Sequence, residues 1–188
     1  MGTPEAARVF TEALVNGEGS HDEEEVDSGA SAPSPPRYPD SAVSFDSLAL
    51  RGLTVLSSAP GHVRCLMPVT REKTNRYGTL HGGCIATLVD VVGTAAIFSV
   101  SPESGVSLHI SVDYLSPAPA GKNVVIDSKV VRVGRTIAVA NVVVESEGDG
   151  GRVLAQGRHL KHVGSSDASR VRGAGSRSAA APGPLSRL

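Results

Sequence analysis

The sequence has no tryptophan, and aromatic residues make up only 3% of its 188 residues. A hydrophobic core must therefore come mainly from Val, Ile, Leu and Ala, which supply most of the 40% of residues that are hydrophobic. Two cysteines, Cys65 and Cys84, are too few for a disulfide framework or a four-cysteine zinc site. We therefore expect no cysteine-based chemistry and a reducing compartment.

Long apolar runs and an excess of basic charge are also lacking. The most apolar stretch, residues 80–100, is interrupted by His81, Asp90 and several glycines and threonines, so it falls short of the ~20 mainly apolar residues of a membrane span. It is predicted to be a core helix. The net charge of −1 disfavours a nucleic-acid partner, which requires a basic face.

The charge is unevenly distributed and suggests three regions. Residues 1–41 carry a net charge of −7, whereas residues 42–163 and 164–188 each carry +3. We predict that 1–41, an acidic and Pro/Ser-rich arm, and 164–188 are disordered, and that 42–163 fold as one domain. The final Ser186-Arg187-Leu188 resembles the Ser-Lys-Leu peroxisomal signal, so a cytoplasmic or a peroxisomal location is expected.

Several familiar catalytic signatures are missing. The sequence has no G-x-S-x-G elbow, no phosphate-binding P-loop, no H-E-x-x-H and no G-x-G-x-x-G after a predicted strand. His159 and His162 would lie on opposite faces of a strand, so they predict no metal site and are expected to be ordinary core or surface histidines.

The hydrophobic pattern predicts an α+β domain in which an antiparallel sheet of five to six strands wraps around one long helix. The long helix follows Thr79, which could cap it, and Gly134-Arg135 should form a two-residue hairpin with Gly134 at positive φ. The last four strands are expected to form a meander, and 106–115 should be half-buried through alternation. The predicted helices are 43–50 and 80–100, and the predicted strands are 53–58, 62–69, 106–115, 123–133, 136–145 and 153–163.

Gly82 and Gly83 stand at the start of the long helix, where two glycines are costly. Free N–H groups and a partial positive charge at a helix N-terminus suit a developing oxyanion. The glycines could therefore admit a ligand carbonyl, or they could allow tight packing of the helix start against a strand. The residues alone favour neither interpretation.

Asp90 is the second anomaly, because it interrupts an apolar helix and its helical neighbours are small. Something should approach this face closely. Asp90 could bond to another copy of the helix, or it could deprotonate a water beside a ligand; a solvent-facing carboxylate is the weaker alternative. Asn75 in the preceding loop, and Ser107 and His109 on the polar face of 106–115, carry little weight by themselves.

Several segments together closely resemble the hotdog-fold thioesterases of the PaaI type, over about residues 45–163. The likeness is carried by Thr74-Asn75-Arg76-Tyr77-Gly78-Thr79-Leu80-His81-Gly82-Gly83, Ala86-Thr87-Leu88-Val89-Asp90, Gly105-Val106-Ser107, Tyr114-Leu115-Ser116-Pro117-Ala118, Gly134-Arg135-Thr136 and Ala155-Gln156-Gly157-Arg158-His159 to Lys161-His162.

The resemblance implies a hotdog fold, an edge-to-edge homodimer that assembles into a homotetramer, and active sites between subunits. It implies that Asp90 activates water as general base or acts as nucleophile, with Ser107 orienting the water. Gly82, through its N–H, and Asn75 would polarise the thioester carbonyl. His81 would support the helix start.

The resemblance also implies where coenzyme A binds. Pro119 stands where a relative can have Lys, which leaves the contacts to the nucleotide end open. No metal or cofactor is expected. The implied substrate-binding residues are Ser107, Tyr114, Leu115, Ser116, Pro117, Ala118, Pro119, Arg132, Val133, Gly134, Arg135, Thr136, Ile137 and His162.

The expected activity is hydrolysis of fatty acyl-CoA or aryl-acyl-CoA to free acid and coenzyme A. An alternative is a non-catalytic hotdog module that binds acyl-CoA and regulates a partner. Asp90, Asn75, Gly82 and Ser107 together favour the enzyme. A hotdog hydratase would be expected to carry an Asp/His pair in a different motif.

Overall fold

A computed structural model of the chain describes residues 5, 45–101 and 105–164. The predicted arm apart from residue 5, and the predicted tail apart from residue 164, lie outside the described residues. The described elements, in chain order, are α2 (Phe45–Ala49), β1 (Thr54–Ala59), β2 (His62–Pro68), the short 3-10 helix η1 (Arg71–Lys73), α3 (Gly82–Phe98), β3 (Val106–Tyr114), β4 (Asn123–Val133), β5 (Ile137–Ser146) and β6 (Val153–His162).

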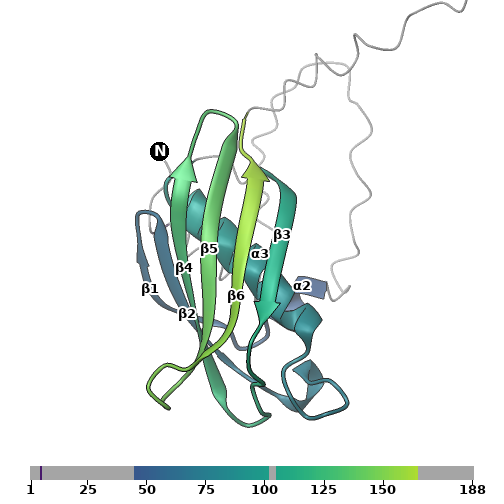
Figure 1. Ribbon diagram of the computed structural model, residues 1–188. Helices are drawn as coiled ribbons and strands as arrows, with labels where there is room; N and C mark the ends of the chain where they lie inside the picture. Colours follow the sequence, from purple (N-terminus) through teal and green to yellow (C-terminus); the bar gives the residue numbers. More distant parts are fainter. Residues whose placement is uncertain (1–4, 6–44, 102–104, 165–188) are drawn as a thin grey trace, which may run out of the picture.

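The strands form one six-stranded antiparallel sheet in the order β1-β2-β4-β5-β6-β3, and α3 lies against one face of it (Figure 1). The predicted antiparallel sheet around one long helix is confirmed. The predicted four-strand meander is wrong, because β3 pairs with β6 at the sheet edge and not with β4. The eight-residue link between β3 and β4 is long enough to carry the chain across the sheet.

The helix α3 packs its apolar side chains into the curved face of the sheet. Leu88, Val89 and Val92 are fully buried and form one cluster with the inward side chains of the strands. The approach is close where β6 carries a glycine: a Cβ at Gly157 would lie 2.5 Å from Val89 Cγ2. A small residue at this strand position is therefore required for the helix to reach the sheet.

The helix begins two residues later than predicted. Its N-cap is His81, not Thr79, and the ring Nδ1 of His81 accepts a hydrogen bond of 2.9 Å from the Gly83 N–H. Thr79 is instead part of the loop before the helix, in a short bridge with Pro119. Among the described residues, no helix is both long and apolar enough to cross a bilayer.

Two details of the strands also differ from the sequence expectation. Gly134 does not have positive φ, and the two central residues of the β4–β5 hairpin are Arg135 and Thr136, because the Gly134 N–H bonds to the Ile137 oxygen at 2.8 Å. In β3 a bulge between Ser107 and His109 breaks the alternation. The strand is therefore not uniformly half-buried: its first apolar side chains are exposed, and Ser107 turns toward α3 instead of lying on a polar outer face.

Candidate active site

Asp90, Ser107 and His159 form a hydrogen-bonded group between α3, β3 and β6. The Ser107 hydroxyl donates to Asp90 Oδ1 at 3.2 Å, and His159 Nε2 lies 2.9 Å from Ser107 Oγ and 3.3 Å from Asp90 Oδ1. The His159 side chain is completely buried, whereas that of Asp90 is 43% exposed. The group therefore has a buried end at the histidine and an open end at the carboxylate.

The environment of His159 favours its neutral form. Burial lowers the pKa of His159 below its usual value, and the nearby Asp90 carboxylate only partly opposes this effect. Nδ1 is buried and has no hydrogen-bond partner among the described residues. Because an unpaired N–H costs more than an unused acceptor, the proton belongs on Nε2. His159 then donates to Ser107, which donates to Asp90.

A second buried polar contact lies beside this group. Lys161 is only 5% exposed, and its Nζ donates to Thr94 Oγ1 at 2.8 Å. Burial lowers the pKa of Lys161, and the Asp90 carboxylate opposes the shift. The Asp90 carboxylate thus acts on two partly desolvated basic groups of β6, His159 and Lys161.

The close approach expected on the small-residue face of α3 comes partly from the chain itself. A Cβ at Gly93 would lie 3.0 Å from His159 Nδ1, so this glycine makes room for the imidazole. Ala86, Thr87 and Asp90 on the same helix remain half-buried. This part of the face stays accessible to a further molecule.

The start of α3 forms a separate polar group. Among the described residues, no acceptor is found for the N–H of Gly82, which occupies the first helical position. The Tyr114 hydroxyl donates to the Gly82 carbonyl at 3.1 Å, and a Cβ at Gly82 would contact the tyrosine ring at 3.4 Å. The Gly82 N–H is therefore free to donate to a ligand, and the Tyr114 ring covers the glycine from one side.

Asn75 shapes the loop that precedes the helix. Its Oδ1 accepts hydrogen bonds from the N–H groups of Tyr77 at 2.9 Å and Thr79 at 3.3 Å, and its Nδ2 donates to Thr79 Oγ1 at 3.0 Å. An amide nitrogen has two N–H donors, so a second donor remains for another acceptor. Asn75 is thus a rigidly held donor near the helix start.

A cavity of about 400 Å³ joins the Asn75 loop, the helix start and the segment after β3. It brings together most of the residues that the resemblance assigned to substrate binding on this side. Pro119, the next residue, bridges to Thr79 on the rim. The lining residues are Asn75, Thr79, Leu80, Gly82, Ile85, Tyr114, Leu115, Ser116, Pro117 and Ala118.

The remaining predicted contacts lie elsewhere, around the β4–β5 hairpin. His162 pairs with Ile137 and with Val106, and the Val163 N–H bonds to the Thr136 oxygen at 2.9 Å. Residues 132–137 and His162 are therefore neighbours near the start of β3. They do not line the cavity at the start of α3.

The two main polar groups are too far apart to act on one bond within a single chain. Gly82 and Asp90 are eight residues apart on the same helix, which corresponds to about 12 Å at ~1.5 Å per residue. A reacting group must lie within about 3 Å of each catalytic atom. One chain thus contains both the carboxylate of Asp90 and the free N–H of Gly82, but it does not bring them to the same place.

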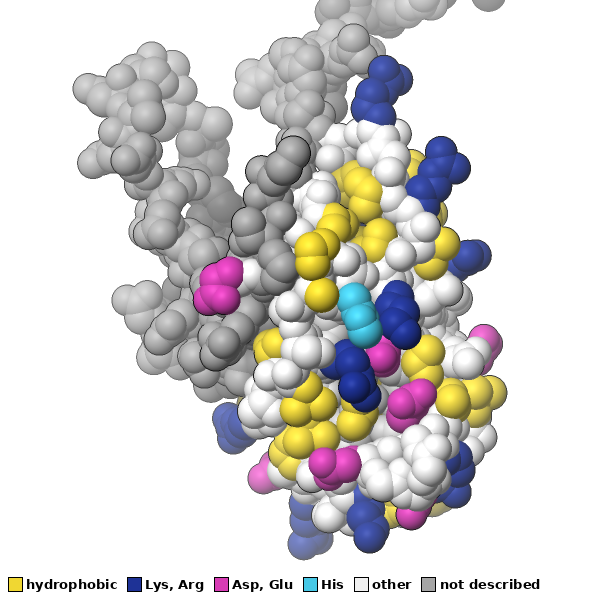
Figure 2. Space-filling view, turned by 90° about the vertical axis from the view of Figure 1, so that its left-hand side faces the viewer, with side chains coloured by type: hydrophobic (Ala, Val, Ile, Leu, Met, Phe, Trp, Pro, Cys, Tyr) yellow, Lys and Arg dark blue, Asp and Glu magenta, His cyan; other side chains and the backbone are white. Residues whose placement is uncertain are grey.

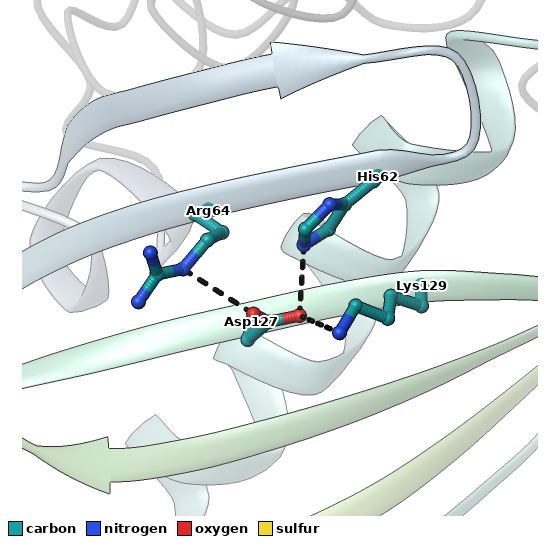
Figure 3. Close-up of polar contacts among 4 residues, drawn as sticks. All are labelled: His62, Arg64, Asp127 and Lys129. Carbon is teal, nitrogen blue, oxygen red and sulfur yellow. Dashed lines mark hydrogen bonds and ion pairs between the residues drawn. The ribbon is translucent and has the colours of Figure 1, made fainter. Parts of the chain in front are cut away.

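A third polar cluster lies on the outer face of the sheet, away from α3. Asp127 contacts three basic side chains: His62 Nε2 at 3.0 Å, Arg64 Nε at 3.2 Å and Lys129 Nζ at 3.7 Å. In the view of Figure 2, lysine and arginine side chains gather beside a histidine with acidic groups between them, and Figure 3 shows the four residues converging from β2 and β4. The cluster links these two strands. The described part of the chain contains no group of three or more His, Cys, Asp or Glu able to hold a metal.

His159 and Lys161 are the residues of the site that sequence reasoning missed. His159 was expected to be an ordinary core or surface histidine, yet it bonds to both Ser107 and Asp90. Alternation along β6 offered a signal, because Ala155 and Gly157 are small and share a face with His159 and Lys161. Small residues on one face of a strand leave room for a helix to pack closely, so this face, with its two basic side chains, is the one expected to lie against α3.

Comparisons with known proteins identify the family of the chain. A family model described as "Thioesterase superfamily" matches residues 77–153. Human acyl-coenzyme A thioesterase 13 is 43% identical over 113 residues, which cover 60% of this chain and 80% of the relative. The chain belongs to the thioesterase superfamily.

Several solved structures share the fold. Zebra fish thioesterase superfamily member 2 has a TM-score of 0.68 and 33% sequence identity, with 87% of this chain and all of that chain covered. A Streptococcus mutans protein, smu.793, solved bound to acetyl CoA, has a TM-score of 0.57 and 27% identity over 68% of this chain and 96% of that chain. This chain is thus a hotdog-fold thioesterase, an enzyme of the thioester hydrolase class.

Proposed function

We propose that this thioesterase hydrolyses acyl-CoA to a free acid and coenzyme A, with Asp90 activating the attacking water. The observation that carries the proposal is the ordered chain His159–Ser107–Asp90, which ends at a carboxylate that solvent can reach. The names of the relatives, among them acyl-coenzyme A thioesterase 13, support coenzyme A as the carrier.

The residues supply the two functions that the reaction needs. Water bound to Asp90 loses a proton to the carboxylate as its oxygen attacks the thioester carbon, and Ser107 helps to hold the water. The carbonyl oxygen becomes an oxyanion, which accepts hydrogen bonds from the Gly82 N–H and from Asn75 Nδ2 at the positive end of α3. The tetrahedral intermediate then collapses, the carbon–sulfur bond breaks, and coenzyme A leaves as a thiolate.

We further propose that each site is shared by two subunits paired through β3. Among the described strands, β3 pairs with β6 on one side and has no partner on the other, and Val106, Leu108 and Tyr114 are exposed along it. Two copies related by a twofold axis would pair these edges antiparallel. The Ser107 end of one β3 would then meet the Tyr114 end of the other, which unites Asp90 with Gly82 of the partner subunit.

Thiol release from a panel of acetyl, medium-chain, long-chain and aryl acyl-CoAs tests the chemistry. We expect turnover by the wild type and a loss of at least ~100-fold in Asp90→Asn, which keeps the shape and removes the base. Binding of acyl-CoA without thiol release by either protein would contradict hydrolysis and favour the regulatory binding module.

Subunit mixing tests the shared site. Asp90→Asn and Asn75→Ala chains, each of which we expect to be nearly inactive alone, are unfolded together, refolded together and assayed. If the site combines the two residues from different subunits, half of the dimers are mixed and each has one intact site, so about a quarter of wild-type activity returns. If both residues of a site come from one chain, mixing restores nothing.

A further inference from the structure

Lys73 is a buried lysine that the proposed reaction does not use. It ends η1 and is only 5% exposed, although removing an ammonium group from water is unfavourable unless the group is well bonded. Its Nζ donates to the carbonyl oxygen of Arg51, in the turn after α2, and to that of Pro68, at the end of β2, at 3.1 Å for Pro68. The Lys73 side chain therefore joins η1 to the α2–β1 turn and to β2.

The backbone of Lys73 closes the loop that carries Asn75. Its carbonyl oxygen accepts a hydrogen bond of 2.8 Å from the N–H of His81, the N-cap of α3. Asn75 follows Lys73 by two residues, and Gly82 follows His81 directly. The two groups proposed to polarise the thioester carbonyl, Asn75 and Gly82, therefore both lie next to the Lys73–His81 hydrogen bond.

The loop that follows Lys73 is held on its other side by the segment after β3. The Leu80 N–H donates to the Ala118 oxygen at 2.8 Å, and the Ala120 N–H donates to the Gly78 oxygen at 3.0 Å. The Lys73 ammonium group bonds the start of the loop to a different part of the chain, the α2–β1 turn and β2. Without this group the loop would keep its bonds to the segment after β3 but lose one of its supports.

Lys73 does not lie in the cavity that contains Asn75 and Gly82. It lines a separate cavity of about 330 Å³ between α2, η1 and the start of α3. Any effect of Lys73 on the thioester must therefore pass through the loop.

We propose that Lys73 is a positioning residue for the thioester carbonyl. Its ammonium group holds the Lys73–His81 hydrogen bond in the place where Asn75 Nδ2 and the Gly82 N–H converge on one oxygen. This inference rests on the proposed function and adds to it a residue that does not touch the substrate.

Amide hydrogen exchange tests the positioning without any turnover. In Lys73→Met, which keeps a long side chain and removes the donors, the N–H groups of His81 and Asn75 should exchange at least ~10-fold faster than in the wild type. Amides in the middle of α3 should be unchanged. Lys122→Met, which alters an exposed lysine just before β4, is the matched control and should affect neither group. Unchanged exchange at His81 in Lys73→Met would overturn the proposal, whether or not the protein hydrolyses thioesters.

Kinetics with the best substrate of the acyl-CoA panel show whether the positioning serves catalysis. Oxyanion donors act mainly in the transition state, so Lys73→Met should lower kcat at least ~10-fold and change KM less than about threefold. Lys122→Met should keep both within about twofold. An unchanged kcat in Lys73→Met would contradict the role, whereas a wild type that releases no thiol would count against the proposed function itself.

A double-mutant cycle separates positioning from general damage to the fold. The losses caused by Lys73→Met and Asn75→Ala should be less than additive, because both act on the same oxyanion. The losses caused by Lys73→Met and Ser107→Ala should add, because Ser107 lies beside Asp90 and not in the loop. Full additivity with Asn75→Ala would overturn the proposal.

Lys73→Arg keeps the charge and tests it through the pH profile. Burial, the largest influence, lowers the pKa of Lys73, whereas Cys84 and Glu72 oppose the shift and Arg51 adds to it; His81 lines the same cavity. In the wild type kcat should fall as the pH rises through this lowered pKa, since the ammonium group loses its charge. A guanidinium group stays charged, and the adjoining cavity has room for it, so Lys73→Arg should keep kcat within about threefold at neutral pH and lack the alkaline decline. An identical alkaline decline in both proteins would exclude a role for the charge of Lys73.

Discussion

Gly93 and His159 fit against each other so closely that a Cβ on Gly93 would lie 3.0 Å from Nδ1 and 3.2 Å from Cβ of the histidine. Gly93 lies on α3 and His159 on β6, and the imidazole reaches past the helix to Ser107. Gly93 limits where the imidazole can lie, and thereby the geometry of the whole hydrogen-bonded group.

Replacing Gly93 by Ala should therefore reduce activity through His159. The added methyl group pushes the imidazole by a few tenths of an ångström, which lengthens its 2.9 Å contact with Ser107. We expect kcat to fall about tenfold, since small displacements of catalytic groups are costly. The measurement is kcat for a short-chain acyl-CoA, together with urea unfolding to show that the protein remains folded.

The control is a double-mutant cycle with His159→Gln. If Gly93 acts by positioning the histidine, Gly93→Ala has almost no further effect in the His159→Gln background. Additive losses would mean that the alanine disturbs α3 or Asp90 independently of His159.

Stability should depend on pH through His159. Burial holds the pKa of His159 below its unfolded value, so the unfolded chain binds more protons as the pH falls through the range below about 6.5. The free energy of unfolding therefore decreases as the solution becomes acidic and levels off below the folded pKa. Urea unfolding between pH 5 and 8 measures this slope. His159→Gln should have a flatter profile over that range, and an identical slope in both proteins would contradict the assignment.

The main features of the fold could be predicted because simple patterns determine them. The single long apolar stretch predicted α3, and alternating residues bounded by glycine-rich turns predicted the strands. The position of β3 in the sheet could not be predicted. The β3–β4 link, which contains Pro117 and Pro119, can connect two neighbouring strands or two strands far apart in the sheet. That placement depends on the packing of all six strands on the helix.

The candidate site was only partly predictable for a related reason. Asp90 was conspicuous as a carboxylate in an apolar helix, but Ser107 was expected on the outer face of its strand. The bulge beside Ser107 turns its side chain to the inner face, toward α3, and nothing in the local sequence predicts this bulge. His159 gains its role through the register of β6 against β3 and its distance from α3, which alternation alone does not specify.

Asp127 should contribute to stability by joining β2 to β4. Asp127→Ala leaves the Arg64 and Lys129 cations close together without their shared carboxylate, so repulsion replaces attraction, and His62 Nε2 loses its partner at 3.0 Å. Because the basic side chains are partly exposed, the expected loss is about 1 kcal/mol and should shrink in high salt. Urea unfolding at low and high NaCl measures both effects. Asp113→Ala, an exposed carboxylate on β3, is the matched control, and equal losses in the two variants would exclude a special role for the cluster.

Lys161 should tune His159. The charge of Lys161 is one of the influences that lower the pKa of His159, although burial is the larger one. Lys161→Met removes that charge and keeps a long apolar side chain. The pKa of His159 should therefore rise, and the imidazole should bind its proton at a higher pH. NMR titration of the imidazole Cε1–H measures the change.

Arg158→Met provides the comparison, because Arg158 is the exposed neighbour of His159 on the opposite face of β6. It removes the same charge from the same strand without emptying the space beside Asp90, and the pKa of His159 should stay nearly constant. Since Lys161 donates to Thr94, Lys161→Met also loses one buried hydrogen bond, and unfolding measurements separate that cost from the change in titration. A pKa that moves equally in both variants would show that long-range charge, and not the buried contact on α3, acts on the histidine.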